Sequence, residues 1–269
     1  MAKFYGPLFN GLDSFHVERD LGIWLAKQSL PIRSPIILSE GQLDPDWQYL
    51  IFEHIPGVSI GQVRDQLSVE DWAAVAQQVG EYLSELHRLG LYPEMVASPR
   101  AKVLPSWEGY AAFLGRQQKD CTSNHKTWND LPEHLLDQLA DFVLPAERLI
   151  DFSAPPHLIH ADLTADHLLG RLVNGRWQTL AVIDWGDAMT GNILYELVAL
   201  YLDLFHADKH LLDIFTTAYG LPDFYRNNFP RQAFSMTLLH QFPMPQSVYT
   251  PHQHVRTLQA VAKRLYSAI

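Results

Sequence analysis

The feature that most constrains this chain is a pair of aspartates, each placed at the end of a short apolar run. Asp162 follows the run "HLIH" by two residues, and Asp184 ends the run "LAVID". Between them, Asn174-Gly175 interrupts an alternating stretch and predicts a tight β-hairpin. Carboxylates at two strand ends can converge on one point, where one accepts a proton from a hydroxyl and the other holds a divalent cation.

The N-terminal part of the sequence predicts one helix and a further hairpin. Residues 13–28 place apolar side chains on one side of a helix that Asp13 or Ser14 can cap. Apolar, β-branched runs at 34–40 and 48–55 flank the turn-rich segment "GQLDPD". This pattern is typical of two antiparallel strands.

The rest of the chain is mostly helical apart from the hairpin between the two aspartates. Residues 68–90 form the clearest predicted helix, because Ser68 and Asp71 make a capping-box start and apolar positions repeat at helical spacing. Residues 105–151 have helical patterns with breaks, and such patterns continue almost to the C-terminus. Strands come early and helices dominate later, so we expect an α+β fold with a small strand-rich part ahead of a larger helical part.

Composition and charge restrict the class of protein. The 269 residues carry a formal net charge of -10, which disfavours a nucleic-acid partner because phosphate binding needs clustered Lys and Arg. The single cysteine, Cys121, cannot form an internal disulfide, and the N-terminus lacks the pattern of a secretion signal. The most apolar segment, 192–205, is too short to span a membrane and carries acidic residues. We therefore expect a cytoplasmic protein with no membrane or nucleic-acid partner.

The segment "GVSIG", residues 57–61, offers a different chemistry. It matches the nucleophile-elbow pattern of serine hydrolases, with Ser59 as the nucleophile. The segment that follows is short and polar, and the alternating strands and helices of a hydrolase are not evident. A glycine-bounded loop leaving a hairpin is the plainer interpretation, and the hydrolase stays a remote alternative.

Zinc binding is the other alternative for the polar stretch around Asp162. His160, Asp166 and His167 lie close to it in the sequence. The spacing of His160 and Asp162 fits poorly with usual zinc ligands, and the sequence has no cysteine pair. Histidines elsewhere, His240 among them, have no partner pattern and are interpreted as structural.

The two aspartate segments resemble the catalytic signature of the aminoglycoside phosphotransferase family, a branch of the protein-kinase-like fold. The stretches "LIHADLTADHLL" and "VIDWGDA" are similar to its His-x-Asp loop and to its strand ending in a metal-binding Asp. The stretches "FHVERDLGIWL", "YLIFEHIPGVSI" and "WAAVAQQVGEYLSELHRLGLY" resemble its N-lobe helix, its hinge and its first long C-lobe helix, and the match covers most of residues 3–220. The resemblance implies a truncated, small N-lobe sheet in residues 1–57 and a larger, mainly helical C-lobe in residues 58–269, which carries the catalytic loop and the metal-binding segment.

The resemblance also implies an activity, the ATP-dependent phosphorylation of a hydroxyl on a small molecule, with Mg²⁺ as cofactor. In this pattern, Lys3 is the strand lysine that touches the nucleotide phosphates, and Glu18 is its partner on the N-lobe helix. The backbone from Glu53 to Ile55 is implied to hydrogen-bond adenine.

The same resemblance implies roles around the two aspartates. Asp162 would orient and deprotonate the acceptor hydroxyl, and Asp184 would bind Mg²⁺ bridging the nucleotide phosphates. His167 falls where the family has a metal-binding Asn, and imidazole is a softer Mg²⁺ ligand than an amide oxygen. His160 is implied to brace the loop, and Glu196 matches an acidic position that supports it.

The start of the sequence departs from the family pattern. Only Met1 and Ala2 precede Lys3, so the two strands and the glycine-rich loop that cover the nucleotide have no counterpart. We expect either that the chain begins inside a longer protein or that it is a reduced version. A reduced version would bind nucleotide weakly or serve as a catalytically inactive binding or scaffold protein.

The last expectation from the sequence concerns the acceptor. Residues 200–269 contain four acids against six bases and are rich in aromatic side chains. Polycationic aminoglycosides would require a pocket lined with carboxylates. We therefore expect a neutral or mildly charged hydroxyl compound with apolar surface.

Overall fold

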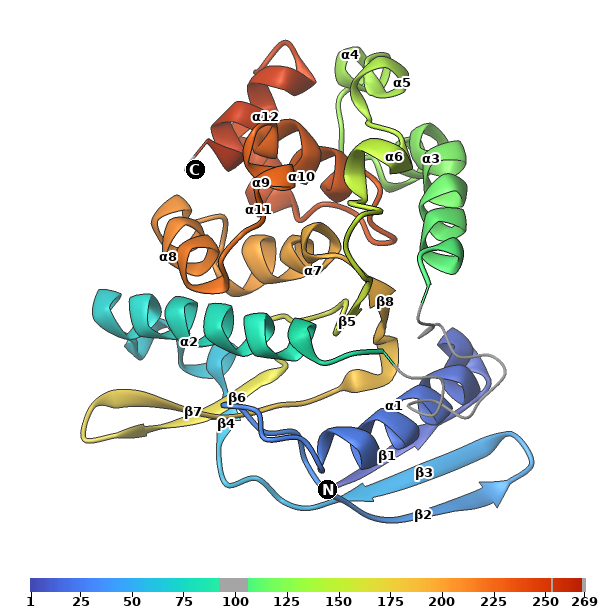
Figure 1. The fold of residues 1–269 in the computed structure, drawn as a ribbon, viewed down its shortest axis with the longest axis vertical. Coiled ribbons are helices and arrows are strands. Elements are labelled where there is room, and N and C mark those ends of the chain that lie inside the picture. The colour runs from blue at the N-terminus through green and yellow to red at the C-terminus, as the bar shows by residue number, and fades with distance from the viewer. Residues whose placement is uncertain (92–105, 253, 268–269) are drawn as a thin grey trace.

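Three antiparallel strands and one long helix form the N-terminal end of the molecule (Figure 1). The computed structural model describes residues 1–91, 106–252 and 254–267. Strand β3 (Trp47–Phe52) lies in the middle of this sheet, with β1 (Ala2–Tyr5) and β2 (Ile37–Asp44) paired to its two edges. The hairpin of β2 and β3 confirms the one predicted from the sequence.

Helix α1 (Gly11–Leu25) connects the N-terminal sheet with the rest of the molecule. Phe15 packs against the sheet in a small apolar cluster. Three other apolar side chains of α1 join the main hydrophobic core: Val17, Leu21 and Leu25. Because one helix contributes to both clusters, α1 sets the position of the sheet relative to the larger, helical part.

The start of α1 differs from the prediction. The helix follows a single 3-10 turn (Leu8–Asn10) and begins at Gly11 without a capping side chain. Neither Asp13 nor Ser14 is the cap, since both already lie within the helix. A Cβ at Gly11 would come within 2.2 Å of the carbonyl oxygen of Gly6. The close return of the chain, rather than a side-chain hydrogen bond, therefore determines where this helix begins.

The two aspartate segments lie on two small sheets. One contains β4 (Val58–Ser59), β6 (Leu168–Val173) and β7 (Arg176–Val182), and the other pairs β5 (His157–Ile159) with β8 (Met189–Gly191). Asn174 and Gly175 have φ angles of 53° and 76°, which confirms the predicted turn between β6 and β7. Strand β8 was not predicted, because three residues are too short for an alternating pattern to be recognised.

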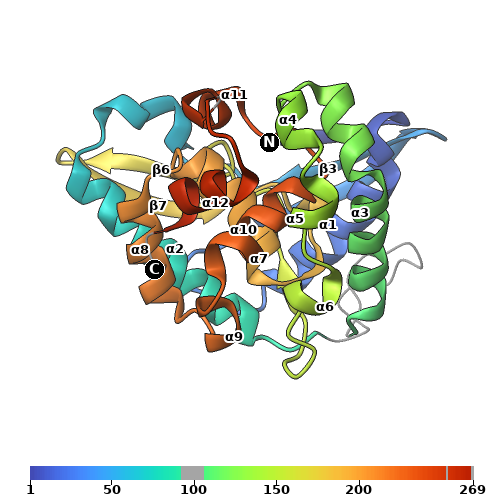
Figure 2. The same cartoon turned by 90° about the horizontal axis from the view of Figure 1, so that it is seen from above.

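The larger part of the molecule is mainly helical, as expected. Helix α2 (Val69–Arg88) begins at the predicted capping box of Ser68 and Asp71 and packs along α8 (Lys209–Tyr219). Further helices are α3 (Glu108–Trp128), α4 (Glu133–Leu136), α5 (Leu139–Phe142), α6 (Ala146–Leu149), α7 (Ile193–Ala199), α9 (Asp223–Arg226), α10 (Phe229–Leu238), α11 (Gln246–Tyr249) and α12 (Leu258–Tyr266). Figure 2 shows α7 and α10 near the centre, with α2 and α8 to one side and α3 to the other. Within the described ranges, no helix combines the length and the apolar character needed to cross a bilayer.

The α+β class expected from the sequence is thus confirmed. Figure 1 shows the N-terminal sheet at one end and the helices from α7 to α12 at the other, with the aspartate segments between them. The division of the chain at residue 57 stays a prediction.

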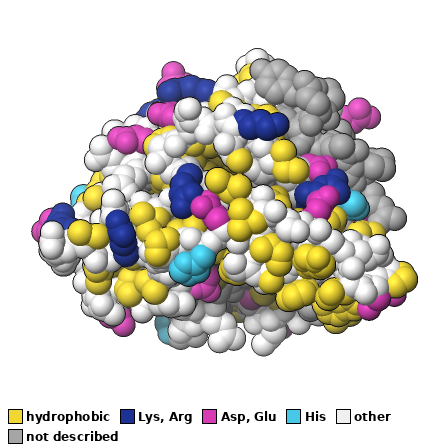
Figure 3. Space-filling view, turned by 90° about the horizontal axis from the view of Figure 1, so that it is seen from below, with side chains coloured by type: hydrophobic (Ala, Val, Ile, Leu, Met, Phe, Trp, Pro, Cys, Tyr) yellow, Lys and Arg dark blue, Asp and Glu magenta, His cyan; other side chains and the backbone are white. Residues whose placement is uncertain are grey.

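The outer face of the N-terminal sheet carries exposed apolar side chains. Leu38 and Leu43 of β2 are 64% and 62% exposed, and Phe4 of β1 is 53% exposed. Figure 3 shows the molecule from this end, where apolar side chains lie between scattered charged ones. The sheet therefore buries mainly the face that packs against α1.

Candidate active site

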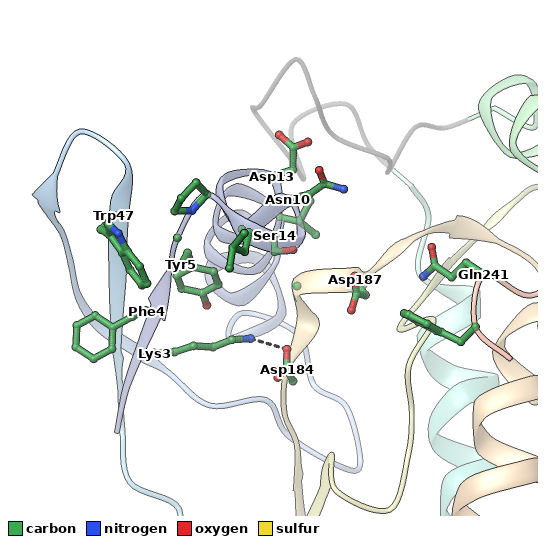
Figure 4. Close-up of a pocket in the computed structure, with 17 residues that line it drawn as sticks. Lys3, Phe4, Tyr5, Asn10, Asp13, Ser14, Trp47, Asp184, Asp187 and Gln241 are labelled. Atoms are coloured by element: carbon green, nitrogen blue, oxygen red, sulfur yellow. Dashed lines mark hydrogen bonds and ion pairs between the residues drawn. The ribbon is translucent and has the colours of Figure 1, made fainter. Parts of the chain in front are cut away.

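Lys3 joins three elements that are far apart in the sequence (Figure 4). Its ammonium lies 2.6 Å from Oε2 of Glu18 on α1 and 2.5 Å from Oδ1 of Asp184, which follows β7. Side chains alternate along β1, so Lys3 and Tyr5 share the inner face of the sheet. The Tyr5 hydroxyl donates to the same Glu18 oxygen at 2.5 Å. The structure therefore brings together the three charged residues that the resemblance linked.

Ion pairing outweighs the cost of burial for the charges of Lys3 and Asp184, whereas for Glu18 burial outweighs the ion pair and raises the pKa of its carboxyl. Burial opposes the charge of Lys3, but the carboxylates of Glu18 and Asp184 hold the pKa of its ammonium above the ordinary value. Burial also disfavours the Asp184 carboxylate, yet the adjacent Lys3 outweighs it and lowers the pKa of Asp184. Both groups therefore stay charged at neutral pH.

His160 links the two aspartate segments. Its Nε2 lies 2.8 Å from the carbonyl oxygen of Ile183, and the N–H of Asp162 donates to its Nδ1 at 3.3 Å. Burial lowers the pKa of His160 to about 3, so the ring is neutral. A neutral ring with its proton on Nε2 satisfies both bonds. His160 thus links the backbone of Asp162 to the residue before Asp184, and its bracing role stays a prediction.

Two acids hold the backbone of the loop that contains Asp162. Glu196 on α7 accepts the N–H of Ala161 at 2.9 Å, and Ala161 has a left-handed φ of 68°. Asp203 accepts the N–H of Ala165 at 2.7 Å. Burial raises the pKa of Glu196 to about 7. Sequence reasoning identified Glu196 but missed Asp203, whose signal was an acid placed inside an otherwise apolar helical run.

His167 lies between the two aspartates. Its Nδ1 is 2.6 Å from the carbonyl oxygen of Asp162 and 3.5 Å from Oδ2 of the same residue, while its Nε2 is 3.8 Å from Oδ2 of Asp184. A carbonyl oxygen only accepts, so Nδ1 carries a proton and a neutral ring keeps its lone pair on Nε2, the nitrogen nearer Asp184. Burial raises the pKa of Asp162 to about 6; His167 opposes this rise, and the carboxylates of Asp187 and Asp184 add to it.

The donors around Asp184 suit a hard divalent cation better than zinc. Mg²⁺ is usually bound through one or two carboxylates together with phosphate oxygens and water. The Asp184 carboxylate and Nε2 of His167 can supply the protein's share. In the part of the chain that the structure describes, no group of three or more His, Cys, Asp or Glu side chains is arranged to hold a metal. The zinc alternative therefore has no support from the described residues.

A cavity of about 500 Å³ lies at the hinge that was expected to bind adenine. Glu53 and Ile55 line it from one side, and Asp166 lines it from the loop that contains Asp162. The N–H of Glu53 donates to the carbonyl of Ile36 at 2.9 Å, and its carboxylate accepts from Arg33 at 2.6 Å. The backbone N–H of Glu53 is thus already hydrogen-bonded within the protein. Of the two backbone groups of Glu53, the carbonyl is therefore the one expected to hydrogen-bond adenine.

Ser59 lies at the end of β4 and lines the same cavity. Its hydroxyl donates to Oδ1 of Asp166 at 3.3 Å. Strand β4 leads into a 3-10 segment (Ile60–Gln66), whereas a nucleophile elbow leads into an α-helix. The hydroxyl is bonded to a carboxylate rather than to an imidazole, so the geometry does not support the hydrolase alternative.

Two further cavities adjoin the aspartates. The larger, about 710 Å³, extends from Lys3 and Asp184 along the start of α1 to Asp187 (Figure 4). The smaller, about 230 Å³, lies beside Asp162, between α7 and the segment that follows α10. Phe242 lines both cavities. Sequence reasoning identified neither cavity, because their walls come from segments distant in the chain.

Comparisons with known proteins agree with this geometry. The model of the family described as "Phosphotransferase enzyme family" (APH) matches residues 6–229. The GDP complex of aminoglycoside 2'-phosphotransferase-IIIa is similar with a TM-score of 0.64 at 19% identity, covering 85% of this chain and 73% of that chain. The ADP-bound aminoglycoside phosphotransferase APH(2'')-Ib is similar with a TM-score of 0.58 at 15% identity, covering 98% of this chain and 88% of that chain. At such identities these likenesses show the fold.

A curated relative is much longer than this chain. Lysine-specific demethylase JMJ21 of Arabidopsis thaliana is 26% identical over 206 residues, which are 65% of this chain and 22% of that protein. The chain thus matches 22% of the length of that relative. Because the family match extends over most of the sequence, the chain belongs to the phosphotransferase enzyme family, and the resemblance and kinase-like fold expected from its sequence are confirmed.

Proposed function

We propose that the protein transfers the γ-phosphoryl group of ATP to a hydroxyl group of a small molecule. The observation that carries the proposal is the ion-paired placement of Lys3, Glu18 and Asp184, with Asp162 on the other side of His167. Phosphoryl transfer needs positioned charges more than covalent chemistry, and this cluster offers a cation for the phosphates and carboxylates for a metal and a proton.

The nucleotide would extend from the hinge cavity to Lys3. The carbonyl of Glu53 and the amide of Ile55 would hydrogen-bond the base, and Lys3, oriented by Glu18, would bind the phosphates. The similar solved structures contain GDP or ADP, which supports a purine nucleotide as donor. ATP is the donor that we propose.

Asp184 and Nε2 of His167 would hold Mg²⁺. When bound, such a cation neutralises the charge on the β- and γ-phosphates. Lys3 bonds Oδ1 of Asp184, and the other oxygen, Oδ2, is the one nearer His167. The carboxylate can therefore keep Lys3 in place with one oxygen and offer the other to the cation.

Asp162 would act as the base for the acceptor hydroxyl. The hydroxyl oxygen forms a bond to the γ-phosphorus while the bond from that phosphorus to the bridging oxygen breaks, and the electron pair leaves with ADP. The hydroxyl proton passes to a carboxylate oxygen of Asp162. With a pKa of about 6, this carboxylate is ionised at pH 7 and is a stronger base than an ordinary aspartate.

His160 and Glu196 would act as positioning residues in this reaction. Their bonds to the Asp162 amide and to the adjacent Ala161 amide hold the loop from both sides. We also propose that the protein works in the cytoplasm, because its single cysteine, Cys121, is a free, buried thiol.

Nucleotide binding and transfer can be measured on the purified protein. We expect Mg²⁺ and ATP to raise the melting temperature, and ADP release to accompany phosphorylation of an added alcohol. Asp162→Asn should lower transfer about 10²–10⁴-fold, because an amide cannot accept the hydroxyl proton, and should keep the nucleotide-induced thermal shift.

The matched control is Asp137→Asn, which makes the same change at an exposed residue outside the three cavities. It should behave as the wild type. Unchanged transfer in Asp162→Asn would remove the base assignment. Absence of any thermal shift with nucleotide, with or without Mg²⁺, would instead favour a catalytically inactive binding or scaffold protein.

A further inference from the structure

We propose that the 230 Å³ cavity beside Asp162 is the acceptor site, and that it selects an uncharged alcohol with an apolar ring, held by His240. This inference rests on the proposed phosphotransferase function. It names the class of acceptor and a residue, His240, that the sequence left without a role.

The position of the cavity fits an acceptor. Asp162 and Thr164 line it, whereas Lys3 and Asp184 line the larger cavity. Phe242 contributes to the walls of both. A hydroxyl in the smaller cavity would thus lie beside the proposed base, while the nucleotide phosphates would lie beside Lys3 and Asp184 in the larger cavity.

Most of the wall is apolar. The apolar side chains that line the cavity are Val198, Ala199, Leu202, Phe242, Pro243, Met244 and Pro245. They come from α7, from the turn after it and from the segment after α10. Such a wall binds a flat or ring-shaped apolar surface through burial rather than through charge.

Apart from the carboxylate of Asp162, the proposed base, and the ring of His240, the polar groups of the wall are largely used within the protein. Asp203 accepts the amide of Ala165 at 2.7 Å. The Thr237 hydroxyl donates to the carbonyl of Ala233 at 3.1 Å and lies 2.7 Å from the Tyr266 hydroxyl. No Lys or Arg is among the described residues that line the cavity. An anion would therefore find no cation, and those ammonium groups of a polycation that do not reach Asp162 or Asp203 would be buried against apolar surface, so both are disfavoured.

His240 is the exception among these polar groups. It is 6% exposed, and its Nε2 has no hydrogen-bond partner among the described residues. The ring packs on Tyr195 with centroids 4.6 Å apart and on Phe242 with centroids 5.7 Å apart. Burial lowers the pKa of His240 to about 4 against an opposing hydrogen bond to the backbone of Ala161, so the ring is neutral and its unpartnered nitrogen can exchange one hydrogen bond with an uncharged ligand. Buried polar groups normally have a partner, and a bound hydroxyl would supply it.

The wall opposite α7 is held in place by a buried ion pair. Nδ1 of His125 lies 2.8 Å from Oδ1 of Asp130, and Nε2 of His125 lies 2.9 Å from the carbonyl of Leu238 at the end of α10. Oδ2 of Asp130 accepts the N–H of Met244 at 3.1 Å. These bonds anchor the segment that carries Phe242 and Met244, so the cavity has a supported wall.

A matched set of alcohols tests the proposed selectivity. The probes are 4-methylbenzyl alcohol, 4-(aminomethyl)benzyl alcohol and 4-(hydroxymethyl)benzoate, which share one ring and one primary hydroxyl and differ in charge, with kanamycin as a polycation. We expect kcat/KM for the neutral alcohol to exceed that of each charged probe at least about tenfold, as burying an unpaired charge predicts. Nucleotide-induced thermal stabilisation is measured in parallel.

The outcomes of this kinetic comparison support or overturn the acceptor assignment. A preference for kanamycin or for either charged benzyl alcohol overturns the acceptor assignment. Turnover of none of the four probes by a protein that binds Mg²⁺ and ATP also overturns it, while leaving nucleotide binding in place. Failure to bind nucleotide overturns the proposed function and this inference with it.

Two variants test the cavity itself. Ala199→Phe places a ring inside the cavity and should lower kcat/KM for 4-methylbenzyl alcohol at least about tenfold, since overpacking excludes the ligand. The matched control is Ala73→Phe, at a half-buried alanine of α2 that lines none of the cavities, and it should leave kcat/KM unchanged. Equal losses in both variants, or no loss in Ala199→Phe, would overturn the assignment.

His240 is tested by a split between KM and kcat. His240→Phe removes the hydrogen bond and should raise KM for the neutral alcohol up to about tenfold, with a smaller change in kcat, as loss of one neutral hydrogen bond predicts. His240→Gln keeps a donor and an acceptor and should recover part of the loss. Loss of kcat alone, without recovery in His240→Gln, would show a merely structural role and overturn the assignment of His240.

Discussion

The cavity beside Lys3 and the cavity beside Asp162 differ in how their polar groups are paired. In the cavity beside Lys3, its ammonium is paired with two carboxylates, that of Glu18 at 2.6 Å and that of Asp184 at 2.5 Å. Beside Asp162, most of the wall is apolar, and Nε2 of His240 has no hydrogen-bond partner within the part of the chain that the structure describes. The cavity beside Lys3 is lined by ion pairs that form without a ligand, whereas the cavity beside Asp162 is lined mainly by apolar side chains and by no Lys or Arg among the described residues.

This difference follows from what each side is proposed to bind. Nucleotide phosphates carry dense negative charge, and a preorganised cation lowers the cost of bringing them together. An alcohol offers little charge, so its affinity has to come from apolar burial and one or two hydrogen bonds. We therefore expect variants of the residues around Lys3 and Asp184 to change the affinity for nucleotide and metal. Variants of the residues that line the cavity beside Asp162 should instead change the affinity for the acceptor.

The largest expected effect is the loss of metal-dependent nucleotide binding in Asp184→Ala. This change removes the carboxylate that would hold Mg²⁺ and also one partner of Lys3. We expect Mg²⁺-dependent nucleotide affinity to fall more than about 100-fold, because even outer partners of metal ligands cost 10–100-fold. Calorimetric titration of ADP with and without Mg²⁺ measures it, and an affinity that keeps its Mg²⁺ dependence would contradict the metal assignment.

Lys3→Met should have the next largest effect. Loss of the ammonium removes charged hydrogen bonds to the phosphates and should raise KM for ATP about 10–100-fold. The double variant with Glu18→Gln should lose little more, because the two side chains form one network. Steady-state kinetics with varied ATP measures both variants, and Lys27→Met, on an exposed lysine after α1, is the control. Additive losses would show that Glu18 has a separate role.

The sequence indicated most of the charged residues around Lys3 and Asp184, but it indicated little of the apolar cavity beside Asp162. Asp162 and Asp184 stand at the ends of apolar runs, and the Asn174-Gly175 turn is a local signal, so the geometry between them could be predicted from neighbouring residues. Lys3 and Glu18 were linked only through the family resemblance, since no local pattern joins a strand residue to a helix residue.

The apolar cavity beside Asp162 could not be predicted from neighbouring residues, because its walls come from segments that are distant in the sequence. His240 was interpreted as structural because its neighbours in the sequence carry no partner for it; its place beside Asp162 depends on how α10 packs against α7. Asp203 does have a local signal, an acid inside an otherwise apolar helical run, but its bond to the Ala165 amide depends on the packing of distant segments. The start of α1 was placed wrongly because a close approach of Gly11 to Gly6, rather than a capping side chain, sets it.

Asp130→Asn should destabilise the protein in a pH-dependent manner. Burial opposes the charge of His125, but the hydrogen bond and charge of Asp130, together with hydrogen bonds to Cys121 and to the backbone of Leu238, outweigh burial and raise the pKa of His125 to about 10. The folded pKa lies above the unfolded value of about 6.5, so the pair stabilises fully below pH 6.5 and its contribution is lost as the pH rises towards 10. The unfolding free energy of Asp130→Asn should be about 3 kcal/mol lower than that of the wild type at pH 6, and the gap should shrink by pH 10.

Urea unfolding at the two pH values measures this gap, with Asp137→Asn as the exposed control. The variant should also raise KM for the acceptor more than KM for ATP, because the pair anchors Met244 in the wall of the smaller cavity. A gap that stays constant from pH 6 to pH 10 would show that His125 is not charged in the folded protein.

The smallest expected effect is that of His167→Asn. His167 contacts both Asp162, beside the smaller cavity, and Asp184, beside the larger one. An amide can still donate to the carbonyl of Asp162, which now receives the bond from Nδ1, and its oxygen is a harder ligand than imidazole for Mg²⁺. Activity with Mg²⁺ should therefore be kept or rise within about fivefold, and the ratio of Mn²⁺ to Mg²⁺ activity should fall. Steady-state rates with each cation measure this ratio, and His210→Asn, at an exposed histidine of α8, is the matched control. A large loss with both cations would mean that the imidazole serves Asp162 rather than the metal, and His167 would then belong to the acceptor side of the site.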